Sequence, residues 1–408
     1  MTATDLAPAA RSSRTIDLTG RPGPFTVYHA LVTVTAVNLN ADRQGLPKTV
    51  VVGDVERMRV SSQALARAAR MRMIGDDPQI RDARRSRLLP AMTAERLKDR
   101  LVDTADAVAA AALIVAAVGM RVAPDDPGRT RAVAFVPADA PDRLADLLQE
   151  SWNELKDARA AAEDAITAAL TRAPRKRNVK VPKDEVLQIP TDQVPDHITK
   201  AAWNAFDPGT TQSIALFGRM LTELDDATIP SSVQIAHAFG VDALDLLLDE
   251  FTVHDDWQDG GVLGRRHGAA VIGEHYLASG TLYRYAALDR RALRANLARS
   301  GAAQDTVESA AQAAERAFGT AITYTLPAAR RSRTGSAVLP TLAVAATCDE
   351  PLSAAAAFET PITAPSGPNA ATALAAYLHH TDLRTGLARW IPPNSQTPPD
   401  LPPALEWR

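Results

Sequence analysis

The sequence of 408 residues contains little cysteine, little lysine and no long apolar run. Its one cysteine, Cys348, excludes a disulfide framework and a cysteine-rich zinc site. Residues 1–24 have no apolar core of the kind that signal peptides carry, so we expect a cytoplasmic protein. The most apolar run, residues 107–120, spans fourteen residues. A membrane span needs about twenty, so we expect a buried helix there and no membrane partner.

The composition is that of an ordinary globular protein, with 46% hydrophobic and 23% charged residues. The formal net charge is −3, so any site for a polyanion must be a local patch. Arginine outnumbers lysine by 38 to seven. This excess has two explanations, a GC-rich genome or phosphate recognition by the guanidinium fork, and the ratio alone does not distinguish them.

The pattern along the chain predicts two kinds of structure. Val, Thr and aromatic residues at 25–37 predict a strand, and residues 49–60 predict a hairpin with Gly53 and Asp54 at its turn. A helix should follow, with Ser61 or Ser62 as its N-cap. Further strands are expected near 211–221, 280–288 and 336–347, and further helices at 75–208, 303–319 and 369–390.

This order predicts an α+β fold in which a small sheet domain is interrupted by a helical insertion. We expect the sheet domain at 25–74, 209–240 and 282–390, the insertion at 75–208, and a glycine-rich excursion at 241–281. Residues 1–24 should be flexible. The tail at 391–408 holds six of the 28 prolines and should be extended or disordered.

The sequence offers no catalytic constellation. The eight histidines form no metal-binding pair on one helical face, and no nucleophile elbow or P-loop is present. We therefore expect no catalytic residue, no metal and no cofactor.

Residues 40–72 are locally basic, with seven basic residues against three acidic ones. Arg67 and Arg70 are three residues apart on the expected helix and should share a face. Free N–H groups at the start of that helix, beside the side chains of Ser61 and Gln63, would suit a phosphate. The alternative is a capped helix with a solvated arginine face. The basic run at 171–183 has the same two interpretations, a solvated loop or a nucleic-acid contact.

Several of these segments resemble one known family. The segment NLNADRQGLPKTVVVGDVERMRVSSQALARAAR (38–70) resembles the opening of the CasC family, the repeated backbone subunit of type I-E CRISPR Cascade complexes. Four further motifs follow in the family's order: FGRM (217–220), SVQIAHAF (232–239), FTVHDD (251–256) and SGTLYRY (279–285). The resemblance covers mainly 25–74 and 210–290.

The resemblance implies a modified RRM-like (ferredoxin-like) palm, a helical fingers insertion and a β-hairpin thumb at 241–281. It also implies a non-catalytic, cytoplasmic subunit. Its partners would be the CRISPR guide RNA, several copies of itself along the guide, the target DNA strand and other Cascade subunits. The thumb of one copy would fold over the RNA held by its neighbour and displace one nucleotide at each repeat.

The resemblance also implies RNA-binding residues. Asn40 and Lys48 would face the RNA backbone, and Met220 would wedge against a base. Phe251, Thr252 and Ile272 would pack beside the displaced nucleotide. For Met220, Phe251 and Ile272, ordinary core packing is the alternative. The remaining implied contacts are Ser61, Gln63, Arg67, Arg70 and Arg219.

The chain departs from the family pattern at three positions. Ala66 stands where a basic residue is usual, Ala41 stands where arginine is common, and Asp54 replaces a glycine. Two expected cationic contacts are therefore missing, although Arg43 is placed to substitute for the second. These departures predict a divergent member of the family that binds RNA more weakly.

Two other functions compete with this one. Backbone subunits of type III complexes resemble this family and cut target RNA with a loop aspartate, for which Asp42 is the candidate. The other alternative is a stand-alone RNA-binding regulator with an RRM-like fold. A co-purified guide of repeat-spacer type would support either backbone subunit, and mixed cellular RNA would support the regulator.

Overall fold

The computed structural model describes residues 23–98, 104–172, 185–221, 223–224, 227–253, 271–328, 331–364, 366–392 and 396–408. Nearly all of the N-terminal extension, most of the basic run at 171–183 and the middle of the expected thumb lie outside these residues. The chain divides into two compact units. The sheet unit comprises 1–77, 233–291 and 315–408, and the helical unit comprises 78–232 and 292–314. Residues 209–232, expected in the sheet domain, thus belong to the helical unit.

The sheet unit is built on one ten-stranded sheet of described residues, in the order β14-β13-β12-β1-β11-β9-β3-β2, with β8 and β10 also paired to β11. All neighbours are antiparallel except β13 and β14. The strands are β1 Phe25–Val37, β2 Thr49–Val52, β3 Val55–Val60, β8 Val233–Ile235, β9 Ala238–Gly240, β10 Asp245–Val253, β11 Val271–Asp289, β12 Leu342–Cys348, β13 Leu383–Trp390 and β14 Leu405–Trp407.

The predicted first strand and hairpin are confirmed. β1 is buried along most of its length because β11 and β12 pair with it on both sides. In the β2–β3 hairpin, Val52 pairs with Val55 across a two-residue turn. Gly53 and Asp54 both have positive φ, 56° and 60°. That is the geometry of a type I′ turn, which suits the right-handed twist of hairpin strands.

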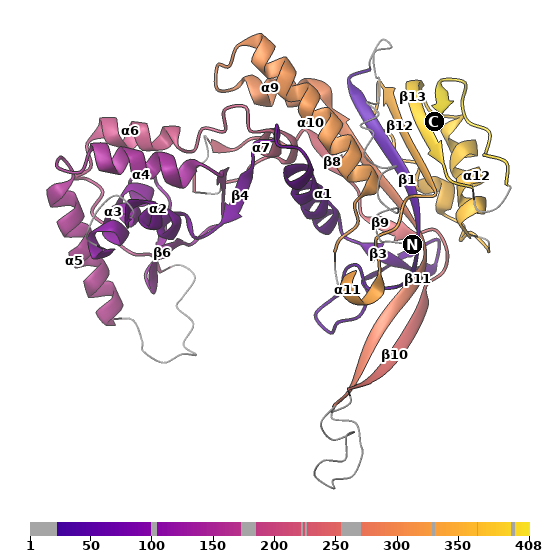
Figure 1. Ribbon diagram of the computed structural model, residues 1–408, viewed down its shortest axis with the longest axis horizontal. Helices are drawn as coiled ribbons and strands as arrows, with labels where there is room; N and C mark the ends of the chain where they lie inside the picture. Colours follow the sequence, from indigo (N-terminus) through magenta and orange to yellow (C-terminus); the bar gives the residue numbers. More distant parts are fainter. Residues whose placement is uncertain are drawn as a thin grey trace, which may run out of the picture. The chain divides into compact units, whose positions relative to one another are not determined.

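Helices cover both faces of this sheet (Figure 1). On one face lie α1 (Ser62–Asp76) and the C-terminal half of α10 (Gln304–Tyr324), where Phe318 packs edge-on against Tyr28 at 5.7 Å. On the other face lies α12 (Ser366–Leu378), whose Leu374 belongs to the same apolar cluster as Leu31 and Tyr283. The sheet is therefore the middle layer of this unit.

One expectation at the C-terminal end needs correction. The predicted helix at 369–390 is α12 followed by strand β13, which pairs with β12. The proline-rich tail, expected to be extended or disordered, is extended at its end, where β14 runs parallel to β13 and Leu401 and Leu405 are buried. The tail thus closes one edge of the sheet.

The helical unit packs around α3 (Thr104–Ala117), the buried helix predicted from its apolar run. Its other helices are α2 Leu89–Lys98, α4 Ala140–Glu150, α5 Lys156–Arg172, α6 Asp196–Asn204 and α7 Gln212–Phe217, with most of α9 Arg290–Ala298. The unit also contains two small antiparallel sheets: β4 Ala83–Ser86 pairs with the distant β7 Ala134–Pro137, and β5 Val122–Ala123 forms a short hairpin with β6 Asp126–Thr130. Within the described residues, no helix is both long and apolar enough to span a membrane.

One prediction in the helical unit is wrong. The strand expected near 211–221 is the helix α7, which ends at Gly218 with a positive φ of 70°. A short apolar run such as SIALF fits a buried helix as well as a strand, and periodicity alone does not distinguish the two.

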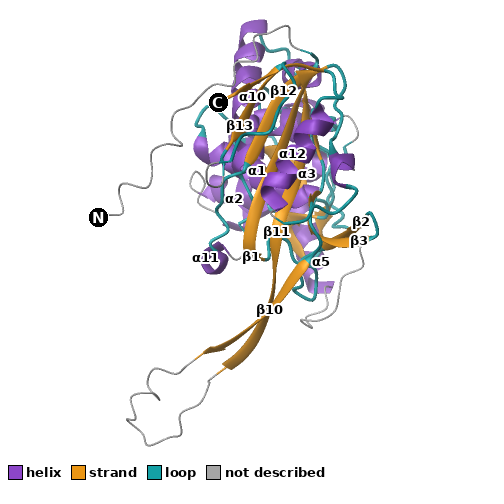
Figure 2. Ribbon diagram, turned by 90° about the vertical axis from the view of Figure 1, so that its right-hand side faces the viewer, coloured by secondary structure: helices purple, strands orange, loops and turns teal. Residues whose placement is uncertain are grey.

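Strand β10 and the first half of β11 form a two-stranded hairpin that projects from the sheet (Figures 1 and 2). Asp245 pairs with Ser279 at its root, and Val253 pairs with Val271 at the last described position. The expected thumb therefore has the form of a long hairpin. Four of its glycines, at 260, 261, 264 and 268, lie outside the described residues.

Candidate nucleic-acid interface

The loop after β1 is joined to the start of helix α1 by one side chain. Asn40 Oδ1 accepts a hydrogen bond from the Ser61 N–H at 2.9 Å. Because that partner is a donor, the amide orientation is fixed, and Asn40 Nδ2 has no partner among the described residues. The Lys48 N–H donates to the Asn40 carbonyl at 2.9 Å. Asn40 and Lys48, both implied to bind RNA, thus lie together, beside the helix start.

The first amides of α1 are mostly occupied, contrary to the sequence-based expectation. Ser61 is the N-cap, and its Oγ accepts from the Ala64 N–H at 3.3 Å. The Ser62 N–H donates to His237 Nδ1 at 3.1 Å. Of the first four N–H groups, only that of Gln63 has no partner among the described residues. The helix start therefore offers a ligand one amide and the exposed side chain of Gln63, not a ring of free donors.

Sequence reasoning missed His237 as part of this surface. It lies exposed at the break between β8 and β9, where the Arg59 Nη1 also approaches its Nδ1 at 3.3 Å. Because the Ser62 amide donates to Nδ1, the ring proton must lie on Nε2 in the neutral form. The motif SVQIAHAF contained this residue, but no spacing rule connects position 237 with position 62.

The basic residues of 40–72 do not form one surface. Arg43, Arg67 and Arg72 are exposed, Lys48 and Arg59 are half-buried, and Arg57 and Arg70 are buried. Arg67 and Arg70 therefore do not share a solvent-facing surface, since Arg70 is 8% exposed and has a partner within the protein. The RNA contacts implied for both stay predictions, and Arg67 is the one whose guanidinium is open to solvent.

Arg57 instead stabilises the fold. Its fully buried guanidinium donates to the carbonyls of Phe358 at 2.7 Å and Glu359 at 2.8 Å. It also reaches the carbonyls of Val241 and Gly240, at 3.2 and 3.4 Å. One side chain on β3 thus ties β9 to the short 3-10 helix η2 (Ala355–Phe358).

Arg219 and Met220, neighbours in the FGRM motif, have opposite environments in the helical unit. Arg219 is 5% exposed and donates to the carbonyls of Phe206 and Ala227 at 2.6 and 2.8 Å. Burial lowers the pKa of Arg219 to about 10, so it stays charged at neutral pH. Met220 is 76% exposed. Met220 is therefore not a core residue, whereas the guanidinium of Arg219 is occupied by the protein.

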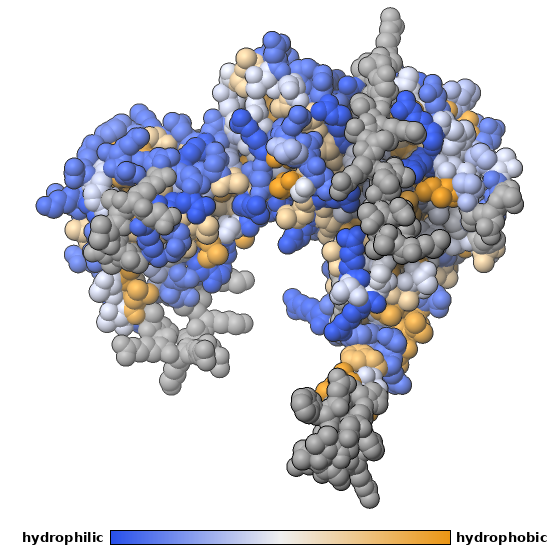
Figure 3. Space-filling model, in the orientation of Figure 1, coloured by the Kyte–Doolittle hydropathy of each residue, from blue (hydrophilic) through white to orange (hydrophobic). Residues whose placement is uncertain are grey.

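The projecting hairpin places the three thumb residues close together. Phe251 lies directly across from Gly273, and Thr252 lies directly across from Ile272. Ile272 is 74% exposed, so core packing is excluded for it, whereas Phe251 is half-buried. Figure 3 shows hydrophobic side chains exposed along this hairpin. An apolar ribbon this exposed needs a covering partner.

The sheet face opposite α1 and α10 is covered. In RRM domains, aromatic side chains on this open face stack on RNA bases. Here His29, Tyr283 and Tyr285 occupy it, but all are buried under α12 and η2. The Tyr283 hydroxyl bonds to His29 Nδ1 and accepts from the Ala354 N–H, both at 2.9 Å. These aromatic side chains are therefore not available to stack on RNA bases.

Asp42, the candidate catalytic carboxylate, is engaged within its own loop. Its Oδ1 accepts from the N–H groups of Gln44 at 2.8 Å and Leu46 at 3.0 Å. This pattern is an Asx-type turn, which orders the loop. The described residues contain no cluster of three potential metal ligands.

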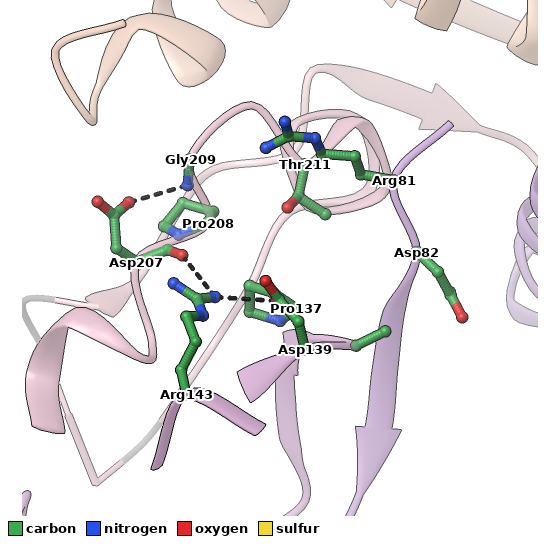
Figure 4. Close-up of a pocket in the computed structure, with 10 residues that line it drawn as sticks. Arg81, Asp82, Pro137, Asp139, Arg143, Asp207, Pro208, Gly209 and Thr211 are labelled. Atoms are coloured by element: carbon green, nitrogen blue, oxygen red, sulfur yellow. Dashed lines mark hydrogen bonds and ion pairs between the residues drawn. The ribbon is translucent and has the colours of Figure 1, made fainter. Parts of the chain in front are cut away.

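A pocket of about 420 Å³ lies elsewhere, in the helical unit (Figure 4). Arg143 points towards its neighbours and donates to Asp139 Oδ1 at 3.1 Å and to the Asp207 carbonyl at 3.4 Å. Asp207 Oδ1 accepts from the Gly209 N–H. None of the predicted site residues lines this pocket. Its central charges pair with each other, which favours a structural role.

The chain is similar over nearly its whole length to subunits of solved assemblies. One is a chain of a structure described as "CRISPR RNA-guided surveillance complex, pre-nicking": 28% identity, a TM-score of 0.69, and coverage of 94% of this chain and 96% of that chain. Another comes from a "CRISPR RNA-guided surveillance complex": 27% identity, a TM-score of 0.61, and coverage of 94% and 95%. Among curated proteins, none matches.

The fold and these matches identify the chain as an α+β protein similar to subunits of CRISPR RNA-guided surveillance complexes. The family model described as "CT1975-like protein" matches residues 27–388. Since this match covers most of the chain, the protein belongs to the CT1975-like family of Cas proteins.

Proposed function

We propose that the protein is a CRISPR RNA-binding backbone subunit of a type I-E Cascade complex in the cytoplasm. Several copies polymerise along the guide spacer and present its bases to the target DNA strand, beside other Cascade subunits. The observation that carries this proposal is the projecting hairpin with Ile272 74% exposed. The same compact unit holds the basic loop of Asn40 and Lys48. Similarity to chains of surveillance complexes supports it.

The connectivity of the sheet supports an RRM-like palm. The order β12-β1-β11-β9, with α1 after β1 and α10 after β11, is that of a split β-α-β-β-α-β unit. The β2–β3 hairpin enters before α1, and the helical unit enters between α1 and β8. We therefore assign the palm to the sheet unit, the fingers to most of the helical unit and the thumb to the β10–β11 hairpin.

We propose further that the subunit is non-catalytic. The Asp42 carboxylate orders its own loop through two amides. A guide-loaded complex should leave complementary RNA intact when Mg²⁺ or Mn²⁺ is present. Regular cleavage that disappears in Asp42→Asn would instead identify a type III-like backbone subunit.

The main proposal is tested by expressing the chain with its genomic neighbours and sequencing the RNA that co-purifies. A guide of repeat-spacer type, bound by several copies per molecule in native mass spectrometry, is the expected result. Mixed cellular RNA bound by a single copy would identify a stand-alone RNA-binding regulator instead. The experiment therefore distinguishes assembly on a guide from RNA binding alone.

A further inference from the structure

A series of side-chain contacts connects the thumb aromatic residue to helix α11 (Arg331–Thr334). The ring of Phe251 stacks on the imidazole of His275, with centroids 4.6 Å apart and planes at 26°. His275 Nε2 lies 3.0 Å from Arg333 Nη1. A guanidinium only donates, so Nε2 accepts and the imidazole is neutral, with its proton on Nδ1. All three residues belong to the sheet unit.

Phe251 depends on His275 because its direct cross-strand neighbour has no side chain. A Cβ added at Gly273 would come within 2.5 Å of the Phe251 ring. The ring therefore lies over the Gly273 backbone, and on the side towards the hairpin root it meets His275. The imidazole is in turn oriented by Arg333, outside the hairpin. The ring's position thus depends on the root of the thumb as well as on the ribbon itself.

We propose that His275 and Arg333 are positioning residues that hold Phe251 against the displaced guide nucleotide. The inference rests on the proposed function, in which the thumb folds over the guide. It goes further by naming the residues that fix the position of the thumb ring.

The test uses the assembled complex and chemical probing of the bound guide. The readout is the ratio of reactivity between displaced and protected nucleotides. His275→Ala and Arg333→Ala should lower this ratio, whereas His275→Phe, which keeps a stacking ring but not the acceptor for Arg333, should lower it less than His275→Ala does. Arg331→Ala removes an exposed arginine of the same helix and is the matched control.

The variant Phe251→Ala distinguishes this inference from the proposed function on which it rests. If Phe251→Ala leaves the guide pattern unchanged, the role proposed for the thumb ring is wrong. If Phe251→Ala removes the pattern while His275→Ala and Arg333→Ala behave like Arg331→Ala, only the positioning role is overturned. Equal guide content in all variants shows that each complex has assembled.

Discussion

Phe251 and Gly273 face each other across the β10–β11 hairpin, and the phenylalanine ring occupies the space that a side chain at 273 would need. The absence of a Cβ at Gly273 thus determines where the thumb ring lies. This contact lies on an exposed ribbon, so altering it changes the ring position more than the stability of the fold.

Gly273→Ala should therefore displace Phe251 and reduce the periodic reactivity of the bound guide, with little change in Tm. Gly75→Ala is the control, because nothing lies within 4 Å of a Cβ at that position in α1. Gly75→Ala should stabilise the protein slightly, by up to about 1 kcal/mol, through helix propensity. An unchanged guide pattern in Gly273→Ala would contradict the role of the ring position.

Arg67→Ala and Arg70→Ala should differ although the residues are one helical turn apart. Each lost phosphate contact should flatten the salt dependence of RNA binding by about 0.7 in the log–log slope. Arg67 is exposed, so its loss should act on RNA alone. Arg70 is buried, so its loss should also lower Tm. An unchanged salt slope in Arg67→Ala would show that this arginine is merely solvated.

The two polar atoms of the Asn40 side chain differ: Oδ1 accepts from the Ser61 N–H, whereas Nδ2 is available to a ligand. Asn40→Asp keeps an oxygen for the Ser61 N–H but replaces the Nδ2 donor with a charge. Stability should be retained and guide affinity should fall, whereas Asn40→Ala should cost about 1 kcal/mol of unfolding free energy. Gln44→Glu adds the same charge to the same loop and is the control. If Gln44→Glu weakens guide binding equally, the effect is general electrostatics and not a specific contact.

Arg57→Met should destabilise the sheet unit strongly, because buried carbonyls of Phe358, Glu359 and Val241 would lose their donor. We expect a loss of about 2–4 kcal/mol of unfolding free energy, measured in urea. Arg43→Met, at an exposed position in the same basic segment, should change it by less than about 0.5 kcal/mol. A loss of RNA binding by folded Arg57→Met would mean that the guanidinium also serves the guide.

His29 should make stability depend on pH. Burial lowers the pKa of His29 to about 3, from an unfolded value of about 6.5. Between these values the unfolded chain binds a proton that the folded chain excludes, so the unfolding free energy falls as pH falls. Protonation of His29 in the unfolded chain lowers the unfolding free energy by about 2 kcal/mol at about pH 5, and this loss disappears above about pH 6.5.

His29→Gln removes the titrating ring, so the difference between parent and variant should narrow as the pH falls from about 7 to about 5. A constant difference between parent and His29→Gln would show that His29 does not titrate in this range.

The sequence predicted the elements whose signals are local. The strand at 25–37, the turn at Gly53 and Asp54, and the N-cap at Ser61 each follow from neighbouring residues. The thumb hairpin was implied by the resemblance to a known family, and Phe251 and Ile272 do lie on its two arms. The helix expected at 369–390 continued too far because only four residues separate the alanine-rich helix α12 from strand β13, which pairs with β12.

The burial and hydrogen-bond partners of individual arginines could not be predicted from neighbouring residues. Arg57 meets carbonyls some three hundred residues away, and Arg219 meets carbonyls on two separate loops. A count of charged residues assumes that both side chains lie on the surface, although both are buried. His237 was missed for the same reason, since only the folded sheet brings it to Ser62. Long-range contacts decide which polar residues remain available to a ligand.

The central position of β1 has a consequence for how the protein is made. This strand is synthesised early, but its partners β11 and β12 begin only at residues 271 and 342. At a synthesis rate of about 5–20 residues per second, β1 stays unpaired for roughly ten to fifty seconds. The helical unit, most of whose residues are contiguous in the chain, has time to fold meanwhile. Folding of the sheet unit thus waits for the C-terminal third of the chain, and chaperones that shield an apolar strand should raise the yield.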